Sequence, residues 1–161
     1  NRDTDGLFLD KSVADNIAVT NLKEISNNLG VINEKQKKKL VDRWIDQLDV
    51  SPPYPNREVE QLSGGNEQKV LLAKWLAYNP KILIVDEPTN GIDVGAKEEI
   101  HQYLRELASQ GMGVIVISSE FPEAMAVGDR ILVMRQGRIV DEMKSSQASQ
   151  EQLLSSALGQ N

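Results

Sequence analysis

Two short stretches of this 161-residue chain combine residue types and spacings that could bind and act on a phosphate. The first contains Ser63, Gly64, Gly65 and Asn66, at the start of an expected helix. Two glycines let a ligand approach the backbone closely, and a helix start offers N–H donors and a positive dipole end. This combination suits an anion such as a phosphate. Ser-Gly-Gly alone is also typical of a helix N-cap, so only the longer string 62–68 indicates a binding site.

The second candidate site follows a short apolar run in residues 82–85. Asp86 and Glu87 come directly after this run, and open α/β sheets bind ligands at the carboxyl ends of their strands. Asp86 could hold Mg²⁺, directly or through water, because Mg²⁺ prefers hard oxygen ligands. Glu87 could orient or deprotonate a water molecule. A bare Asp-Glu pair is more often two solvated acids, but here the Ser63 string lies one helix upstream.

The residues before these two sites predict a helical lobe. Ser12 opens a short helix that runs to about residue 19, and Asn33 opens a longer one. Apolar residues of the longer helix, Trp44 and Ile45 among them, recur at helical spacing, so we expect them in the core of the lobe, with a contact to a partner as the alternative. Three prolines within residues 51–55 then break the pattern.

After this break, helices alternate with apolar strands, which is typical of an α/β domain with a largely parallel sheet. The continuous apolar runs predict strands buried on both faces. We expect His101, an isolated histidine in mid-helix, on the surface. The expected elements are helices at 66–78, at 95–109, from Pro122 and from Ser149, strands at 82–85 and 114–117, and a hairpin of 131–134 with 138–143. The last helix should dock through Leu153, Leu154, Ala157 and Leu158.

Composition excludes several classes of protein. The chain is 40% hydrophobic and 26% charged, carries a formal net charge of −6, and contains no cysteine. These values exclude a disordered polyelectrolyte and a disulfide scaffold, and they disfavour a nucleic-acid binder, which needs a basic face. No apolar run approaches the ~18–20 residues of a membrane span, and we expect no signal peptide. Because the chain starts at Asn1 without an initiator methionine, we expect a fragment.

The two sites together resemble the signature and Walker B motifs of the ATP-binding cassette (ABC) family. The strings 62–69 and 88–97 are close to those of sugar-importer cassettes. Residues 91–93, which end in Asp93, fall where the family has its D-loop, at the dimer seam. The resemblance implies an α/β, P-loop NTPase-like (ABC ATPase) sheet with a helical subdomain.

The sequence departs from the family's pattern in two places. The phosphate loop G-x-x-x-x-G-K-[ST] occurs nowhere in it, and Ser119 stands where typical cassettes carry the switch histidine. With serine at this position, the chain resembles the second cassette of fused, two-cassette importer ATPases for sugars such as ribose, galactose or xylose. The resemblance therefore implies the C-terminal part of such a cassette, lacking the N-terminal Walker A part. Its expected parts are a residual N-terminal segment with the helical subdomain (1–62), a RecA-like core (63–145) and a C-terminal helix (146–161).

The resemblance also implies a role for each candidate residue. Residues 63–66 would bind, in trans, an ATP molecule held by the partner cassette, and Asp93 would link the two nucleotide sites. Asp86 would bind Mg²⁺ at the other site. Glu87 and Ser119 would be the catalytic residues there, although that site is often degenerate in the family.

The implied activity is that of an ATP hydrolase that drives the import of a monosaccharide, with ATP and Mg²⁺ as cofactors. The implied partners are the first ATP-binding cassette, of the same or another chain, membrane-spanning permease subunits and, indirectly, a periplasmic or extracellular sugar-binding protein. No nucleic acid is expected. Such a subunit would lie peripherally at the cytoplasmic face of the membrane. The isolated chain is expected to be inactive.

Two other readings of the motifs stay open. A soluble ABC-type ATPase of translation or DNA repair would predict a basic surface and Leu-Asp after Pro-Thr-Asn, whereas this chain is acidic and has Gly-Ile-Asp at 91–93. A degenerate regulatory cassette without catalytic activity is favoured by Ser119. The intact Asp86, Glu87 and Ser63 argue against it.

Overall fold

The computed structural model describes residues 6–159, which form two compact units. The first unit comprises the residues up to Lys81 and the segment Gly91–Ala96, and the second comprises Ile82–Asn90 and the residues from Lys97 onward. The expected division into 1–62, 63–145 and 146–161 stays a prediction. Within residues 6–159, no helix combines the length and the apolar character that crossing a membrane requires.

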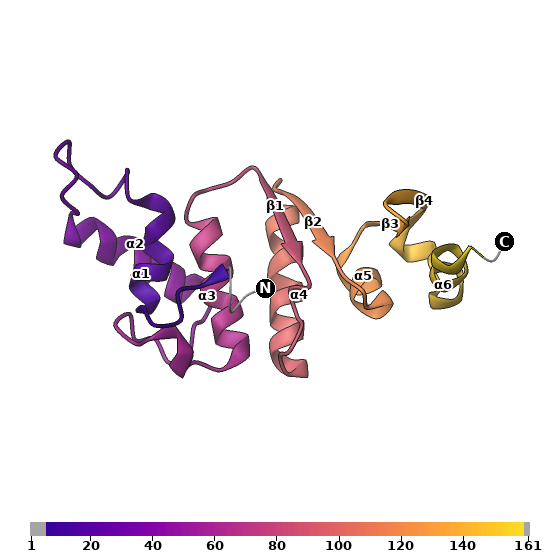
Figure 1. Cartoon of the computed structure of the whole chain (residues 1–161), viewed down its shortest axis with the longest axis horizontal. Helices are drawn as coiled ribbons and strands as arrows, with labels where there is room; N and C mark the ends of the chain where they lie inside the picture. The colour runs from indigo at the N-terminus through magenta and orange to yellow at the C-terminus, as the bar shows by residue number, and fades with distance from the viewer. Residues whose placement is uncertain (1–5, 160–161) are drawn as a thin grey trace. The chain divides into compact units, whose positions relative to one another are not determined.

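The first unit is built from three helices, and their caps explain where two of them begin. The helices are α1 (Val13–Ala18), α2 (Glu34–Gln47) and α3 (Gly64–Leu76), with short 3₁₀ turns at Val19–Asn21 and Val59–Gln61 (Figure 1). The side chain of Ser12 accepts a hydrogen bond from the Asp15 N–H, and that of Asn33 accepts from two N–H groups of the first turn of α2. Side chains of this kind satisfy donors that a helix start leaves unpaired, so both expected starts are confirmed.

The core of the first unit lies where α1 packs against α2 and α3. Trp44 and Ile45 on α2 are buried, as the helical spacing predicted, and they join fully buried residues of α1 and α3 such as Ile17 and Leu76. The buried Asn16 side chain bonds the backbone N–H and carbonyl of Phe8. This pair of bonds ties the start of the described chain to α1.

The second unit contains a β-α-β arrangement. Strand β1 (Ile82–Asp86) pairs in parallel with β2 (Gly113–Ile117), and α4 (Val94–Ser109) connects them. The register places Asp86 opposite Ile117, so the carboxyl ends of both strands lie at one edge.

The prediction that these strands are buried on both faces is wrong. Ile82 and Ile84 on β1 are each 62% exposed, whereas Leu83 and Val85 between them are buried. The one crossover helix between the strands can cover a single face of the pair, which explains the alternation. Ile117 on β2 is exposed as well.

The remainder of the second unit consists of α5 (Phe121–Val127), the antiparallel hairpin of β3 (Arg130–Arg135) and β4 (Arg138–Lys144), a 3₁₀ turn at Ser145–Gln147, and α6 (Gln150–Leu158). The described strands thus form two separate pairs, one parallel and one antiparallel, rather than one largely parallel sheet.

Helix α6 begins at the expected capping box of Ser149 and Gln152. Leu153 is buried against the hairpin residues Ile131 and Val133, and Ala157 packs against the same cluster. Leu154 and Leu158 are exposed, so the expectation that they dock is wrong. At helical spacing they fall outside the narrow face that a two-stranded hairpin can cover.

Candidate functional site

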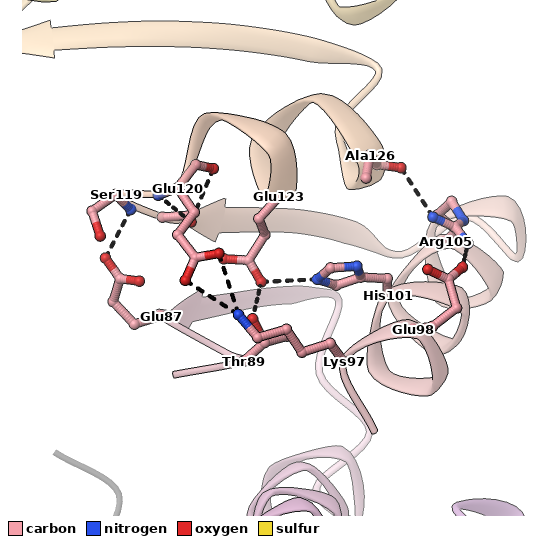
Figure 2. A network of polar contacts seen from close by, with 11 residues as sticks. Glu87, Thr89, Lys97, Glu98, His101, Arg105, Ser119, Glu120, Glu123 and Ala126 are labelled. Atoms are coloured by element: carbon pink, nitrogen blue, oxygen red, sulfur yellow. Dashed lines mark hydrogen bonds and ion pairs between the residues drawn. The ribbon is translucent and has the colours of Figure 1, made fainter. Parts of the chain in front are cut away.

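The carboxyl ends of β1 and β2 bring together the acidic pair and the serine that the sequence singled out. Glu87 adopts a left-handed conformation (φ +47°), and its N–H donates to the Ile117 carbonyl at 2.8 Å. Its carboxylate accepts a hydrogen bond from the Ser119 N–H at 2.8 Å (Figure 2). Asp86 is exposed at the end of β1. The structure therefore places the carboxylates of Asp86 and Glu87 and the residue Ser119 at one sheet edge.

This edge offers oxygen ligands suited to Mg²⁺. Mg²⁺ is usually held by one or two carboxylates together with water and phosphate oxygens, so the exposed Asp86 carboxylate fits such a role. Residues 6–159 contain no group of three or more His, Cys, Asp or Glu side chains that could hold a metal ion by themselves.

A buried polar cluster lies beside this edge. The Thr89 hydroxyl donates to Glu123 Oε1 at 2.6 Å, and His101 Nε2 lies 2.9 Å from the same oxygen. Because a carboxylate only accepts, His101 Nε2 donates there. The expectation of a surface His101 is wrong, since His101 is 7% exposed and Glu123 is 4% exposed. The carboxylate on α5 provides the partner that makes burial of the imidazole possible.

The pKa of the Glu123 carboxyl is lowered in this cluster. Burial by itself raises its pKa, but hydrogen bonds from Ser118, Thr89 and His101, together with the attraction of a charged His101, outweigh burial. Glu123 is therefore held as a carboxylate. Thr89 and Glu123 were not among the predicted site residues. One signal could have indicated a buried His101: it lies between the apolar Ile100 and Leu104 on the buried face of α4.

The other group of predicted residues lies in the first unit, at the N-terminal end of α3. Ser63 is the N-cap residue and is exposed, but its side chain makes no capping hydrogen bond. Asn66 Nδ2 donates to the Ser63 hydroxyl oxygen at 2.9 Å, and Asn66 Oδ1 accepts from the Ser51 N–H at 2.7 Å. Asn66 thus orients the Ser63 side chain. The Ser63 side chain does not cap the helix start, where the positive end of the helix dipole lies.

The second glycine of this string packs closely against the segment that carries Asp93. A Cβ at Gly65 would lie 2.7 Å from the Ala96 Cβ, which is closer than real Cβ contacts. The Ala96 N–H donates to Asp93 Oδ1 at 2.9 Å, so Asp93 caps the start of α4. Gly65, Ala96 and Asp93 are therefore joined by direct contacts within the first unit.

A family model and several solved structures resemble this chain. A family model described as "ABC transporter" matches residues 2–90. A chain titled as an inward-facing putative metal-chelate type ABC transporter aligns with a TM-score of 0.79 at 21% identity, covering 93% of this chain and 59% of that one. A dimeric, post-hydrolysis ATP-binding cassette bound to ADP and phosphate aligns with a TM-score of 0.72 at 26% identity, covering 86% and 59%.

Several relatives carry one name, ribose import ATP-binding protein RbsA. The protein from Clostridium tetani is 45% identical over 98% of this chain, and that from Bacillus subtilis is 44% identical over 99%. A Rhizobium etli protein named ribose import ATP-binding protein RbsA 2 is 49% identical over 96% of this chain and 30% of its own length. The chain spans 31% of the length of the Clostridium tetani protein.

Proposed function

Because the chain belongs to the ABC transporter family, we propose that it forms part of the nucleotide-binding subunit of a monosaccharide importer. Relatives named as ribose import ATP-binding proteins align with nearly all of it, which supports a sugar as the cargo. The subunit would hydrolyse ATP, and this chain would correspond to the C-terminal part of the second of two fused cassettes. The parts of that cassette would be the N-terminal segment with the helical subdomain (1–62), the core (63–145) and the last helix (146–161).

The proposed role of the α3 start is to contact an ATP molecule held by the partner cassette. Residues 63–66 suit this role, because Ser63 is exposed, Asn66 holds its hydroxyl oxygen, and the helix dipole favours a phosphate. Asp93 would lie between the two nucleotide sites, since the Ala96–Gly65 contact joins its segment to this helix start. These residues would then contact ATP only when the two cassettes close over it.

The proposed role of the β1–β2 edge is to serve the other nucleotide site. Asp86 would hold Mg²⁺, which when bound neutralises phosphate charge. Glu87 would orient the attacking water molecule and accept a proton from it. The Ser119 N–H would hold the Glu87 carboxylate in place by a hydrogen bond. Ser119 would take the place of the switch histidine, so this site would be the weaker of the two.

The proposed partners follow from the same assignment. They are the first ATP-binding cassette, membrane-spanning permease subunits and, indirectly, an external sugar-binding protein. The subunit would lie at the cytoplasmic face of the membrane, bound to its permease.

The observation that carries this proposal is the exposed Ser63, whose hydroxyl accepts a hydrogen bond from Asn66 and does not cap α3. The test is ATP turnover by the full-length protein assembled with its permease. We expect Ser63→Arg to abolish turnover, because a long cation at the helix start blocks closure over the partner's ATP. We expect Glu87→Gln to reduce turnover much less, because it serves the weaker site.

A matched control for Ser63→Arg is Ser146→Arg. Ser146 is exposed in a 3₁₀ turn that carries none of the proposed site residues, so the same change in charge and size should leave turnover unaltered. Full turnover in Ser63→Arg would refute the proposed function. Equal losses of turnover in Ser63→Arg and Glu87→Gln would refute the proposal that one nucleotide site is weaker than the other.

A further inference from the structure

We propose that α4 positions the switch segment, residues 118–123, against Glu87 through three side chains spaced four residues apart. These are Lys97, His101 and Arg105, called here the α4 ladder. At this spacing three side chains lie on one face of a helix, and Figure 2 shows all three reaching toward the switch segment or α5. The inference rests on the proposed function for the meaning of the Glu87 site, but its geometry lies wholly within the second unit.

The first contact of the ladder holds the residue next to Ser119. Lys97 Nζ lies 3.2 Å from both carboxylate oxygens of Glu120. The Glu120 N–H in turn donates to the Ser118 hydroxyl at 3.0 Å. Ser119 is therefore flanked by two residues that make polar contacts, Ser118 and Glu120.

The second contact is buried, whereas the contacts of Lys97 and Arg105 are exposed to solvent. His101 and Thr89 both bond one carboxylate oxygen of Glu123, so α4, the loop after β1 and α5 meet at one atom. Breaking a bond to a buried carboxylate leaves charge without compensation, so this junction resists displacement. It fixes the first turn of α5, which forms the last part of the switch segment.

The third contact fixes the far end of α5. Arg105 Nη1 donates to the Ala126 carbonyl at 3.0 Å, and Nη2 donates to Glu98 at 3.1 Å. A carbonyl in the last turn of a helix lacks an intrahelical partner, so a cation is favourable there. With only seven residues, α5 depends on such tertiary contacts to stay helical.

Together the three contacts determine where the Ser119 N–H points. The switch segment begins at the end of β2, and the ladder holds it at Glu120 and at Glu123. Between these fixed points the Ser119 N–H meets the Glu87 carboxylate. His101 is therefore a positioning residue for Glu87, although it touches neither Glu87 nor Ser119 in the described contacts.

The test is hydrogen exchange and the chemical shift of the Ser119 amide, measured by NMR on this chain. In His101→Leu we expect about tenfold faster exchange at Ser119, the change expected from losing one to two net hydrogen bonds. The amide proton should also shift upfield as its bond to a carboxylate weakens. In His101→Gln, whose amide nitrogen can donate to Glu123, exchange should return to within about twofold of the wild-type rate.

The matched control is Gln102→Leu, one residue along α4, where the side chain is exposed and bonds only Glu106 in the described contacts. It should leave the Ser119 amide unchanged. Should His101→Leu fail to fold, Lys97→Met decides, because it removes an accessible contact of the ladder and should speed Ser119 exchange about threefold.

Unchanged Ser119 exchange in the folded variants would overturn the positioning role. Equal effects of His101→Leu and His101→Gln would do the same, because a packing role alone would not distinguish them in this way. The proposed function is tested separately by turnover in Ser63→Arg. Retained turnover there would refute the function and leave the exchange result intact.

Discussion

At the scale of single residues, the buried Glu123 links the stability of the second unit to pH. Its pKa is lowered from an ordinary value of 4.5, since hydrogen bonds outweigh burial. A group with a lowered folded pKa adds stability above its unfolded pKa and loses it as pH falls through the folded pKa. We therefore expect the free energy of unfolding to drop below about pH 4.5, and Glu123→Gln to remove that part of the drop. Urea unfolding between pH 7 and pH 3 measures this.

The control for this prediction is Glu106→Gln, at an exposed position of α4. This variant should show the same dependence of the free energy of unfolding on pH as the wild type. A wild-type profile that is identical to that of Glu123→Gln at every pH would contradict the lowered pKa.

Gly65 allows a second prediction at residue scale, about close packing. Gly65→Ala places a Cβ 2.7 Å from that of Ala96, and overpacking of this kind typically costs about 1–3 kcal/mol. Ala96→Gly removes the opposing atom, so the double variant should recover most of the lost stability in urea unfolding. Strictly additive losses would show that the two residues do not meet. Recovery would mean that Gly65 serves packing as well as ligand approach.

At the scale of secondary-structure elements, Leu153 is the one residue of α6 that is buried against the hairpin. Leu153 is 1% exposed against Ile131 and Val133, whereas the adjacent Leu154 is exposed. Leu153→Ala should lower the free energy of unfolding of the second unit by ~3 kcal/mol, and Leu154→Ala should stay within about 0.5 kcal/mol. Thermal unfolding of the two variants measures the difference. Similar losses would contradict the observed docking face.

The helix starts were predictable from sequence because capping is local. Ser12, Asn33 and Ser149 each act on N–H groups two or three residues away, so a short string contains the whole interaction. Burial of β1 was not predictable in the same way. Whether Ile84 is covered depends on which helices reach that face, and an apolar run does not encode this.

The candidate site was predictable only in part, for the same reason. The types and order of Asp86, Glu87 and Ser119 indicated one sheet edge, and parallel pairing of β1 and β2 brings them there. The buried position of His101 depends on Glu123, 22 residues later in the chain. A lone histidine on a helix does not reveal a partner at such a separation.

At the scale of the whole molecule, the proposed residues fall into two groups. Ser63 and Asp93 belong to the first unit, and Asp86 and Glu87 belong to the second. The chain also spans only about a third of the length of its curated relatives. In the proposed function, Ser63 contacts an ATP molecule held by the partner cassette, so we expect that the chain by itself neither hydrolyses ATP nor binds it tightly.

Thiol modification of Ser63→Cys tests this central claim most directly. The chain contains no cysteine, so the new thiol is its only one, and a cysteine-free background extends the test to the full-length protein. We predict that Mg²⁺-ATP slows alkylation of this thiol in the assembled full-length protein, and only when the phosphate loop of the partner cassette is intact. The isolated chain should show no such protection. Protection by ATP in the isolated chain, or an unchanged rate in the assembled protein, would contradict the account.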